Sequence, residues 1–187
     1  MQRNPVDRWG SVSQSLHWLI VAGVVVMATL GLSMTDLPDT PHKVRMYALH
    51  KSTGLTIFAL MLLRLAWRLH AGAPRAPARM PRWQRRAASA THAALYALLL
   101  AMPVSGWLIN SSSGFPLHWF GLVRVPQFGG RDEALNAVAK ELHEWLFWTL
   151  LALALVHAAA ALWHHLVQRD PTLARMLPRR WLKEFDE

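Results

Sequence analysis

Four long apolar stretches constrain the fold of this chain more than any other feature of its sequence. Each contains or approaches the roughly 20 apolar residues that an α-helix needs to cross the hydrocarbon core of a bilayer. Hydrophobic residues make up 53% of the 187 residues, and charged residues only 17%. The expected helices cover residues 14–34, 46–70, 84–110 and 135–168. The sequence therefore predicts an all-α bundle of four transmembrane helices, a single integral membrane domain over residues 1–187.

The distribution of basic residues predicts the orientation of the four spans. Of the 20 lysines and arginines, 14 fall in the two terminal tails, the loop between the second and third spans, and the adjoining span ends. Because basic residues concentrate on the cytoplasmic side, both termini are expected inside. The six bases on the outer side are matched by six acids. The net charge of +9 therefore reflects topology and anionic lipid headgroups, and nucleic acid is not expected as a partner.

The absence of cysteine restricts the cofactors that the chain can hold. Thiolate-held iron–sulfur clusters and covalently attached c-type haem are excluded. Any cofactor must therefore be bound non-covalently, and histidine, which occurs 10 times, is the most suitable ligand.

Histidines recur at matched depths near the ends of the predicted spans. Fourteen residues of helix rise about 21 Å and complete nearly four turns, so residues i and i+14 share a face near opposite sides of the membrane. This spacing relates His17 to Gly31, His50 to Arg64, His92 to Gly106, and His143 to His157. With the N-terminus inside, His50 and His143 lie at outer depth, and His17, His92 and His157 lie at inner depth.

Two histidines on facing helices at one depth can bind one haem iron axially and leave no open position. At outer depth the pair is His50 and His143. At inner depth we assign His17 and His157, with His92 as a neighbour and as the alternative to His17. A single histidine at a span end is commonly an interfacial residue, but four at two matched depths favour ligation. The prediction is therefore two b haems in the bundle core.

Glycines and arginines share the faces that carry these histidines. Gly31 and Gly106 lie at outer depth, where a flat macrocycle needs the backbone to be close, although small residues also mediate ordinary helix packing. Arg64 and Arg68 continue the face of His50 at inner depth. They are candidate partners of the haem propionates, because guanidinium groups bind carboxylates in bidentate geometry. The alternative is that both arginines reach to the inner headgroups.

Several short strings, in a fixed order, resemble those of a known family. They are "SLHW" at the start of the first span, "LHKSTG" and "LLRLAWRL" in the second, "MPVSGW" in the third, and "LHE", "VHAAAALWHH" and "DPTLARMLPRR" in the fourth and the tail. On these strings the chain resembles the bacterial cytochrome b561 family over almost its whole length. The resemblance implies four haem ligands, His17, His50, His143 and His157, a place in the bacterial inner membrane, and electron exchange with ubiquinone.

The resemblance also implies a reaction, because the family includes superoxide oxidases. We therefore expect superoxide to be oxidised at the periplasmic side and its electrons to reach ubiquinone. The alternative is a general electron-transfer subunit that passes electrons between a dehydrogenase or hydrogenase partner and the quinone pool. A third possibility, a metal transporter or haem-free scaffold, is supported only by Glu144 beside His143. The sequence does not fix the electron donor or the oligomeric state.

Two further side chains are candidates for binding the substrates, and the long outer loop is a candidate for contact with the membrane–water interface. Lys51 follows His50 at the water-facing rim, where a positive charge would attract an anion such as superoxide. His164 continues the face of His157 at the inner interface, either as a contact of the quinone headgroup or as a plain interfacial histidine. In the long outer loop, aromatic residues such as Trp119 are expected at the membrane interface as a belt or lid.

Overall fold

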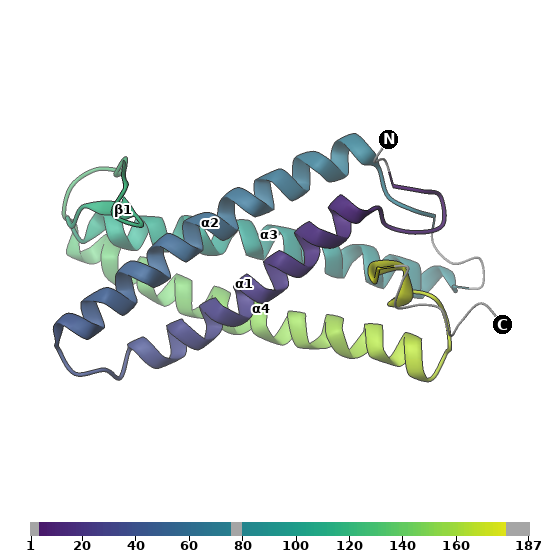
Figure 1. Cartoon of the computed structure of the whole chain (residues 1–187). Coiled ribbons are helices and arrows are strands. Elements are labelled where there is room, and N and C mark those ends of the chain that lie inside the picture. Colours follow the sequence, from purple (N-terminus) through teal and green to yellow (C-terminus); the bar gives the residue numbers. More distant parts are fainter. Residues whose placement is uncertain (1–3, 76–79, 179–187) are drawn as a thin grey trace.

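Four antiparallel helices form the bundle that the computed structural model describes over residues 4–75 and 80–178. They are α1 (Ser11–Met34), α2 (Pro41–Ala71), α3 (Arg82–Ser112) and α4 (Glu133–Leu166). The start of α1 and the short helix η1 (Ala174–Met176) lie at one end, and a small β hairpin lies at the other (Figure 1). All four helices are long and apolar enough to cross a membrane. The predicted all-α bundle with four spans is confirmed.

Each helix begins two to five residues before its predicted start. Each added stretch contains polar or charged residues, such as Ser11, Arg82 and Glu133, so a search for continuous apolar residues starts after them. Pro41 opens α2, where its fixed φ and missing N–H suit the first helical turn. Asp132 caps α4, because its side chain accepts a hydrogen bond from the Leu135 N–H at 3.0 Å. Local chemistry at the first turn therefore accounts for the starts of α2 and α4.

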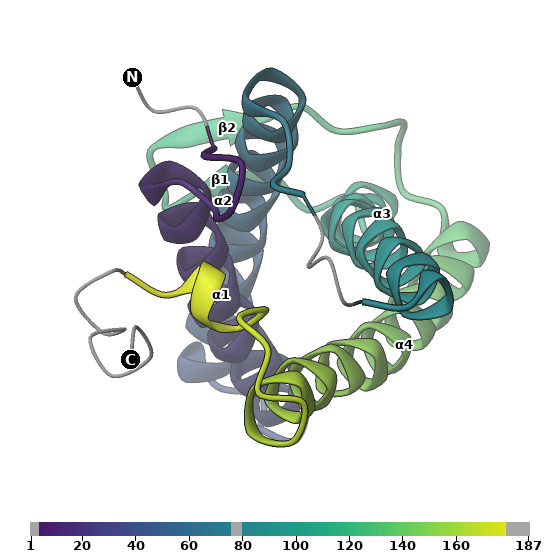
Figure 2. The same ribbon diagram turned by 90° about the vertical axis from the view of Figure 1, so that its right-hand side faces the viewer.

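The helices are arranged as two antiparallel pairs (Figure 2). α1 packs against α2 and α3 against α4, while α2 and α3 join the pairs, and α1 and α4 approach each other more distantly. A buried apolar cluster of Ile20 from α1 with Ile57 and Met61 from α2 lies between the outer and inner histidine depths. Partly buried residues of α3, including Tyr96 and Leu99, pack against it. The two histidine sites are therefore separated by apolar side chains.

The end of the bundle predicted to face the cytoplasm brings together basic segments that are far apart in the sequence. The Arg8 side chain donates to the Leu177 carbonyl oxygen at 2.9 Å, and the Arg175 side chain donates to the Arg75 carbonyl oxygen at 2.8 Å. Of the bases used to predict the orientation, Arg3, Arg79, Arg179, Arg180 and Lys183 lie outside the described residues.

The chain after α4 turns back across this inner end as a strap, residues 168–178, which contains η1 (Figure 2). The side-chain amide nitrogen of Gln14 donates toward three carbonyl oxygens, those of Trp9, Arg175 and Leu177, at 3.0, 3.2 and 3.1 Å. Gln14 is buried, so these bonds satisfy carbonyl groups that water reaches poorly. One side chain of α1 thus ties the strap to the chain segment that precedes the first span.

The long outer loop forms a hairpin that the sequence interpretation did not predict. Strands β1 (Leu117–Trp119) and β2 (Val123–Val125) pair antiparallel, with Leu117 opposite Val125 and Trp119 opposite Val123. Strands of three residues are too short for an alternating pattern to stand out in a sequence. The loop is therefore a folded element attached to the bundle.

Replacing Gln14 by leucine is expected to release the strap, because leucine has similar size but donates no hydrogen bond. Each carbonyl left without a donor costs roughly 1–3 kcal/mol while it stays buried, so the strap would move into water. Trypsin cleavage after Arg175, followed in detergent by mass spectrometry, should become several-fold faster. Gln84→Leu on α3 is the matched control and should leave the rate unchanged; equal rates for wild type and Gln14→Leu would contradict this role of Gln14.

Candidate cofactor sites

The outer site brings together a histidine from each helix pair. The imidazole rings of His50 on α2 and His143 on α4 have their centres 6.4 Å apart, with their planes at 70°. Each ring lies against a glycine of the neighbouring helix: a Cβ atom at Gly31 would lie 3.4 Å from His50 Cε1, and one at Gly106 would lie 3.3 Å from His143 Cε1. These glycines therefore leave space for the imidazole rings themselves. The sequence had suggested that they leave space for a macrocycle.

A buried hydroxyl fixes the tautomer of His143. Ser105 Oγ lies 2.8 Å from His143 Nδ1 and donates its hydrogen to the Met102 carbonyl oxygen, also at 2.8 Å. A hydroxyl has one hydrogen to donate, so Ser105 accepts from the Nδ1–H of His143. The lone pair of Nε2 is then free for a metal, and an oriented Nδ1–H is the usual second contact of a metal-bound histidine.

His50, the other member of the outer pair, lacks such a contact. Its Nδ1 is buried and has no hydrogen-bond partner among the described residues. A buried polar nitrogen without a partner is costly, so no protein contact at Nδ1 offsets the burial of this ring. The two histidines of the outer site therefore differ in how firmly their rings are oriented.

The inner site contains three histidines. The rings of His17 on α1 and His157 on α4 have their centres 6.4 Å apart, with their planes at 83°. His92 on α3 lies closer to His157, at 5.4 Å between ring centres. The structure therefore places all three residues of the sequence prediction together, in one cluster at the inner depth.

The ring separations indicate which histidines can share one metal ion as axial ligands. Metal–nitrogen bonds of about 2.0–2.1 Å, with roughly 1.2 Å from each nitrogen to its ring centre, would place two imidazoles that bind one ion from opposite sides about 6.5 Å apart. The pairs His50–His143 and His17–His157 both have this separation. The pair His92–His157, at 5.4 Å, is too close for that arrangement. The histidines present therefore fit a cofactor iron at each end of the bundle, which His50 with His143 and His17 with His157 would hold.

Two arginines of α2 border the inner site. Arg64 lies near enough to His17, His92 and His157 to interact electrostatically with all three. Its Nε donates to the Tyr96 hydroxyl and its Nη1 to the Ser13 carbonyl oxygen, both at 3.1 Å.

Arg68 is held between aromatic rings, one turn beyond Arg64. Its guanidinium carbon lies 5.4 Å from the centre of the Trp9 ring and 5.8 Å from that of Tyr96. Such cation–π contacts orient a guanidinium group and leave its N–H groups free for an acceptor. Both arginines are therefore fixed by the protein at the inner end.

His164, at the end of α4, has a partner that the sequence interpretation missed. Its Nδ1 lies 2.5 Å from Asp170 Oδ2, and the exposed fractions of the two side chains are 15% and 20%. Burial opposes ionisation of Asp170, but hydrogen bonds from Thr172 and His164 outweigh it and hold the pKa of this carboxyl below its usual value. Asp170 lies beyond the helix, and Arg169, with φ at +49°, reverses the chain toward His164. Helical spacing cannot reveal such a contact.

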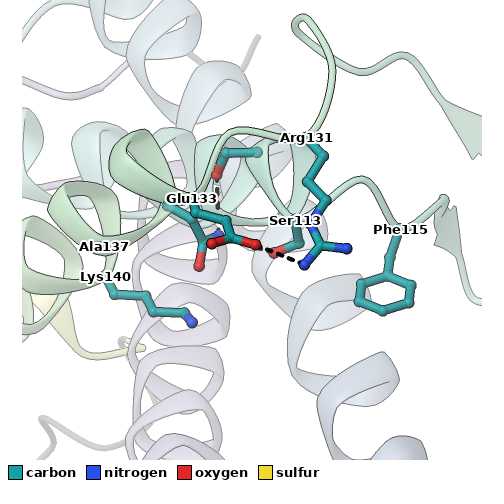
Figure 3. A pocket seen from close by; sticks show the side chains of 8 residues that line it. Ser113, Phe115, Arg131, Glu133, Ala137 and Lys140 are labelled. Carbon is teal, nitrogen blue, oxygen red and sulfur yellow. Dashed lines mark hydrogen bonds and ion pairs between the residues drawn. The ribbon is translucent and has the colours of Figure 1, made fainter.

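A cavity of about 440 Å³ opens at the outer end, between the end of α3 and the start of α4. Figure 3 shows the Arg131–Glu133 ion pair at this cavity, 2.8 Å long, with Phe115 and Lys140 on the lining. Lys140 precedes His143 by three residues on α4, so it lies about 4.5 Å farther out along the helix. Lys51, the cation singled out from the sequence, is partly buried beside His50.

Sequence reasoning found the histidines and arginines of these sites but missed Ser105 and Tyr96. Both lie on α3, one as the neighbour of Gly106 and the other at four residues from His92. Serine and tyrosine are common in spans, so neither stands out by residue type. The available signals were positional. Ser105 directly precedes Gly106, and Tyr96 lies one helical turn after His92.

Comparisons with known proteins agree with this geometry. The family model of prokaryotic cytochrome b561 matches residues 8–179. The chain is 37% identical over 177 residues to cytochrome b561 homolog 2 of Escherichia coli (strain K12), covering 93% of each chain. It is 31% identical to cytochrome b561 homolog 1 of the same strain, covering 94% of this chain and 99% of that protein. It is 27% identical to the probable superoxide oxidase CybB of Yersinia pestis, covering 92% of this chain and 97% of that protein.

Ser105→Ala is expected to leave the Nδ1–H of His143 without its acceptor, because alanine has no hydroxyl oxygen. An imidazole ligand that loses this acceptor donates less electron density to iron, so a redox titration of the protein should show one haem at a higher reduction potential. Ser105→Thr keeps the hydroxyl and is the control. Identical potentials in Ser105→Ala and wild type would show that Ser105 does not act on this ring.

Proposed function

Because the chain belongs to the prokaryotic cytochrome b561 family, we propose that it transfers electrons from superoxide at the periplasmic side of the membrane to ubiquinone. Membership and the four spans make it a multi-pass electron-transfer protein of the bacterial inner membrane, with haem b as its cofactor. The substrates at the two ends are the proposed part. They are supported by the relative named a probable superoxide oxidase and by the residues at each end of the bundle.

The observation that carries the proposal is the repetition of one histidine geometry at two depths. His50 with His143, and His17 with His157, have ring centres 6.4 Å apart, and no third residue is needed at either site. Haem iron bound between such pairs supplies one-electron redox chemistry. Each iron would be held by imidazoles alone, so the electron step would need no exchange of ligands at the metal. Two such sites in line suit a path for electrons across the membrane.

The residues around the inner site suit the carboxylates of a haem. Arg64 and Arg68 are candidate partners of the propionates, since a fixed guanidinium binds a carboxylate through paired N–H groups. Arg64 uses Nε and Nη1 in hydrogen bonds to the protein, which holds its plane in place. His92 then acts as a neighbour of His157 that fills the inner cluster without binding iron.

The residues at the outer end suit a small anion. Lys51 adjoins His50, and Lys140 lines the cavity three residues before His143. Arg131 contributes less, because Glu133 lies 2.8 Å from it and offsets its charge. Since the outer acids and bases balance, attraction of superoxide must come from such local groups.

His164 is the proposed contact of the quinone at the inner end. The His164 Nδ1 is hydrogen-bonded to Asp170, so Nε2 is the nitrogen that can contact a quinone oxygen. Reduction of one ubiquinone to ubiquinol takes two electrons and two protons, so two superoxide ions are oxidised to oxygen for each quinone.

The haem-binding assignments predict the outcome of four histidine substitutions. The purified protein should contain two low-spin b haems per chain by reduced-minus-oxidised spectroscopy and haem extraction. His143→Ala and His157→Ala should each lose one haem with a different spectral component. His17→Ala should lose the same component as His157→Ala, and His92→Ala should retain both haems. Loss of a haem in His92→Ala, with both retained in His17→Ala, would make His92 the ligand.

Lys51→Glu is expected to slow reduction of the haems by superoxide several-fold, because it replaces an attracting charge near the outer site by a repelling one. The effect should shrink as salt is added, since ions screen the interaction. Stopped-flow spectroscopy with a superoxide pulse measures the rate, and the absorption spectrum should not change. Lys43→Glu is the control with the same change of net charge, farther from His50. Equal slowing in both variants would remove the specific role of Lys51.

A second candidate function is electron transfer between a soluble dehydrogenase or hydrogenase and the quinone pool. The family shows electron transfer in general, and the two relatives of higher identity are named only as cytochrome b561 homologs, so this function also agrees with the comparisons. Reduction of the pure protein by superoxide, followed by reoxidation on addition of ubiquinone, supports the first function. Failure of superoxide to reduce it, with isolation as a stable complex with an oxidoreductase, supports the second.

A further inference from the structure

The outer hairpin is amphipathic, and the bundle covers only part of its apolar face. Residues opposite each other in the register share a face, so Leu117, Trp119, Val123 and Val125 form the apolar face and His118 with Arg124 the polar one. Leu117, near the base, is 3% exposed. Trp119 and Val123, near the tip, are 39% and 53% exposed. The apolar face therefore extends past the helices that cover its base.

The hairpin is attached to α2 at the start of the uncharged part of that span. The Phe120 N–H donates to Ser52 Oγ at 2.9 Å, and Trp119 Nε1 donates to Thr56 Oγ1 at 3.1 Å. Ser52 follows Lys51, and no charged residue occurs between Lys51 and Arg64 on α2. These bonds hold the tip at the level where the hydrocarbon region begins.

The other arm of the loop is attached to α3 at a similar level. Trp107 Nε1 donates to the Pro126 carbonyl oxygen at 2.8 Å, and the rings of Trp107 and Phe128 have their centres 4.5 Å apart. Both arms thus fold back along the helices, and Figure 1 shows the hairpin alongside the end of the bundle.

The tip itself presents large apolar side chains. Phe120 is 49% exposed and Leu122 is 80% exposed. Phe120 has φ at +47°, in the left-handed region that bulky residues rarely adopt, and its bond to Ser52 holds it there. The fold therefore keeps two large apolar side chains together at the tip, only partly covered by protein.

We propose that this hairpin tip, Phe120–Gly121–Leu122, docks into the outer leaflet of the bilayer. Its apolar side chains enter the boundary between headgroups and acyl chains, a region where aromatic residues are favoured. The exposed residues of the polar face, His118 and Arg124, then lie toward the lipid phosphates. The surface is continuous with the membrane-facing sides of α2 and α3, to which the loop is bonded. Lipid is therefore the occupant, and the loop is a membrane anchor at the outer end of the bundle.

The absence of native cysteine allows a direct test with single-cysteine variants. A nitroxide label is attached to Leu122→Cys, and the protein is reconstituted in vesicles of phosphatidylethanolamine and phosphatidylglycerol. Asp39→Cys is the control for water, because the native side chain is 96% exposed in the outer turn between α1 and α2. Leu155→Cys is the control for lipid, because it lies at an exposed position within the span of α4. Electron paramagnetic resonance then measures collisions with oxygen, which enters lipid, and with a water-soluble nickel chelate.

The ratio of oxygen to nickel collisions at Leu122→Cys should exceed that at Asp39→Cys by roughly fivefold and approach that at Leu155→Cys. A ratio equal to that at Asp39→Cys places the tip in water and overturns the proposal. Low collision with both reagents shows that protein covers the tip, which also overturns it. Val123→Cys repeats the test on the apolar strand face if the label at 122 disturbs the hairpin. An unchanged absorption spectrum verifies that each variant is intact.

Discussion

The structure depends on pairing imidazoles from opposite helix pairs in the interior of a membrane protein. Apolar helices in a bilayer gain nothing from hydrophobic burial against one another, so packing and polar contacts must specify how they associate. Here α1 with α2 and α3 with α4 form the close pairs, and histidines at two depths face each other across the space between them. Polar nitrogens in such a place are costly until they are bound. Haem b, which family membership implies, would satisfy them if these histidines bind its iron as proposed, and would hold the two halves together.

The two sites share a ligand geometry but differ in their surroundings. Outside, Ser105 orients His143, while His50 Nδ1 has no partner in the described part of the chain. Inside, a third histidine and the charge of Arg64 adjoin the pair. Hydrogen bonds to ligands, nearby charge and burial set haem potentials, so the two haems are expected to differ in potential. The apolar cluster separates the two sites, and the cofactors would carry the electrons between them.

Much of this arrangement could be predicted because helical geometry links sequence spacing to depth and face. The four spans, the outer pair and the three-histidine inner cluster all followed from segment length and the fourteen-residue spacing. The missed features have contacts that cross the bundle or leave the helices. Ser105 meets His143 across 38 positions of sequence, and Asp170 meets His164 only after the chain reverses. The hairpin was missed because its strands are short and its contacts are with α2.

Composition and residue spacing predicted the number of spans, the non-covalent binding of any cofactor and the set of histidines at each depth, because bilayer thickness and helical rise act locally. They did not determine which inner histidines share one axis, since His17 and His92 lie at one depth on different helices. Tertiary packing sets the ring separations to His157, 6.4 Å for His17 and 5.4 Å for His92, and these favour His17 as the proposed partner. Tertiary packing also decided the role of Gly31 and Gly106. Whether a glycine faces a ring, a lipid or another helix depends on neighbours that no local pattern specifies.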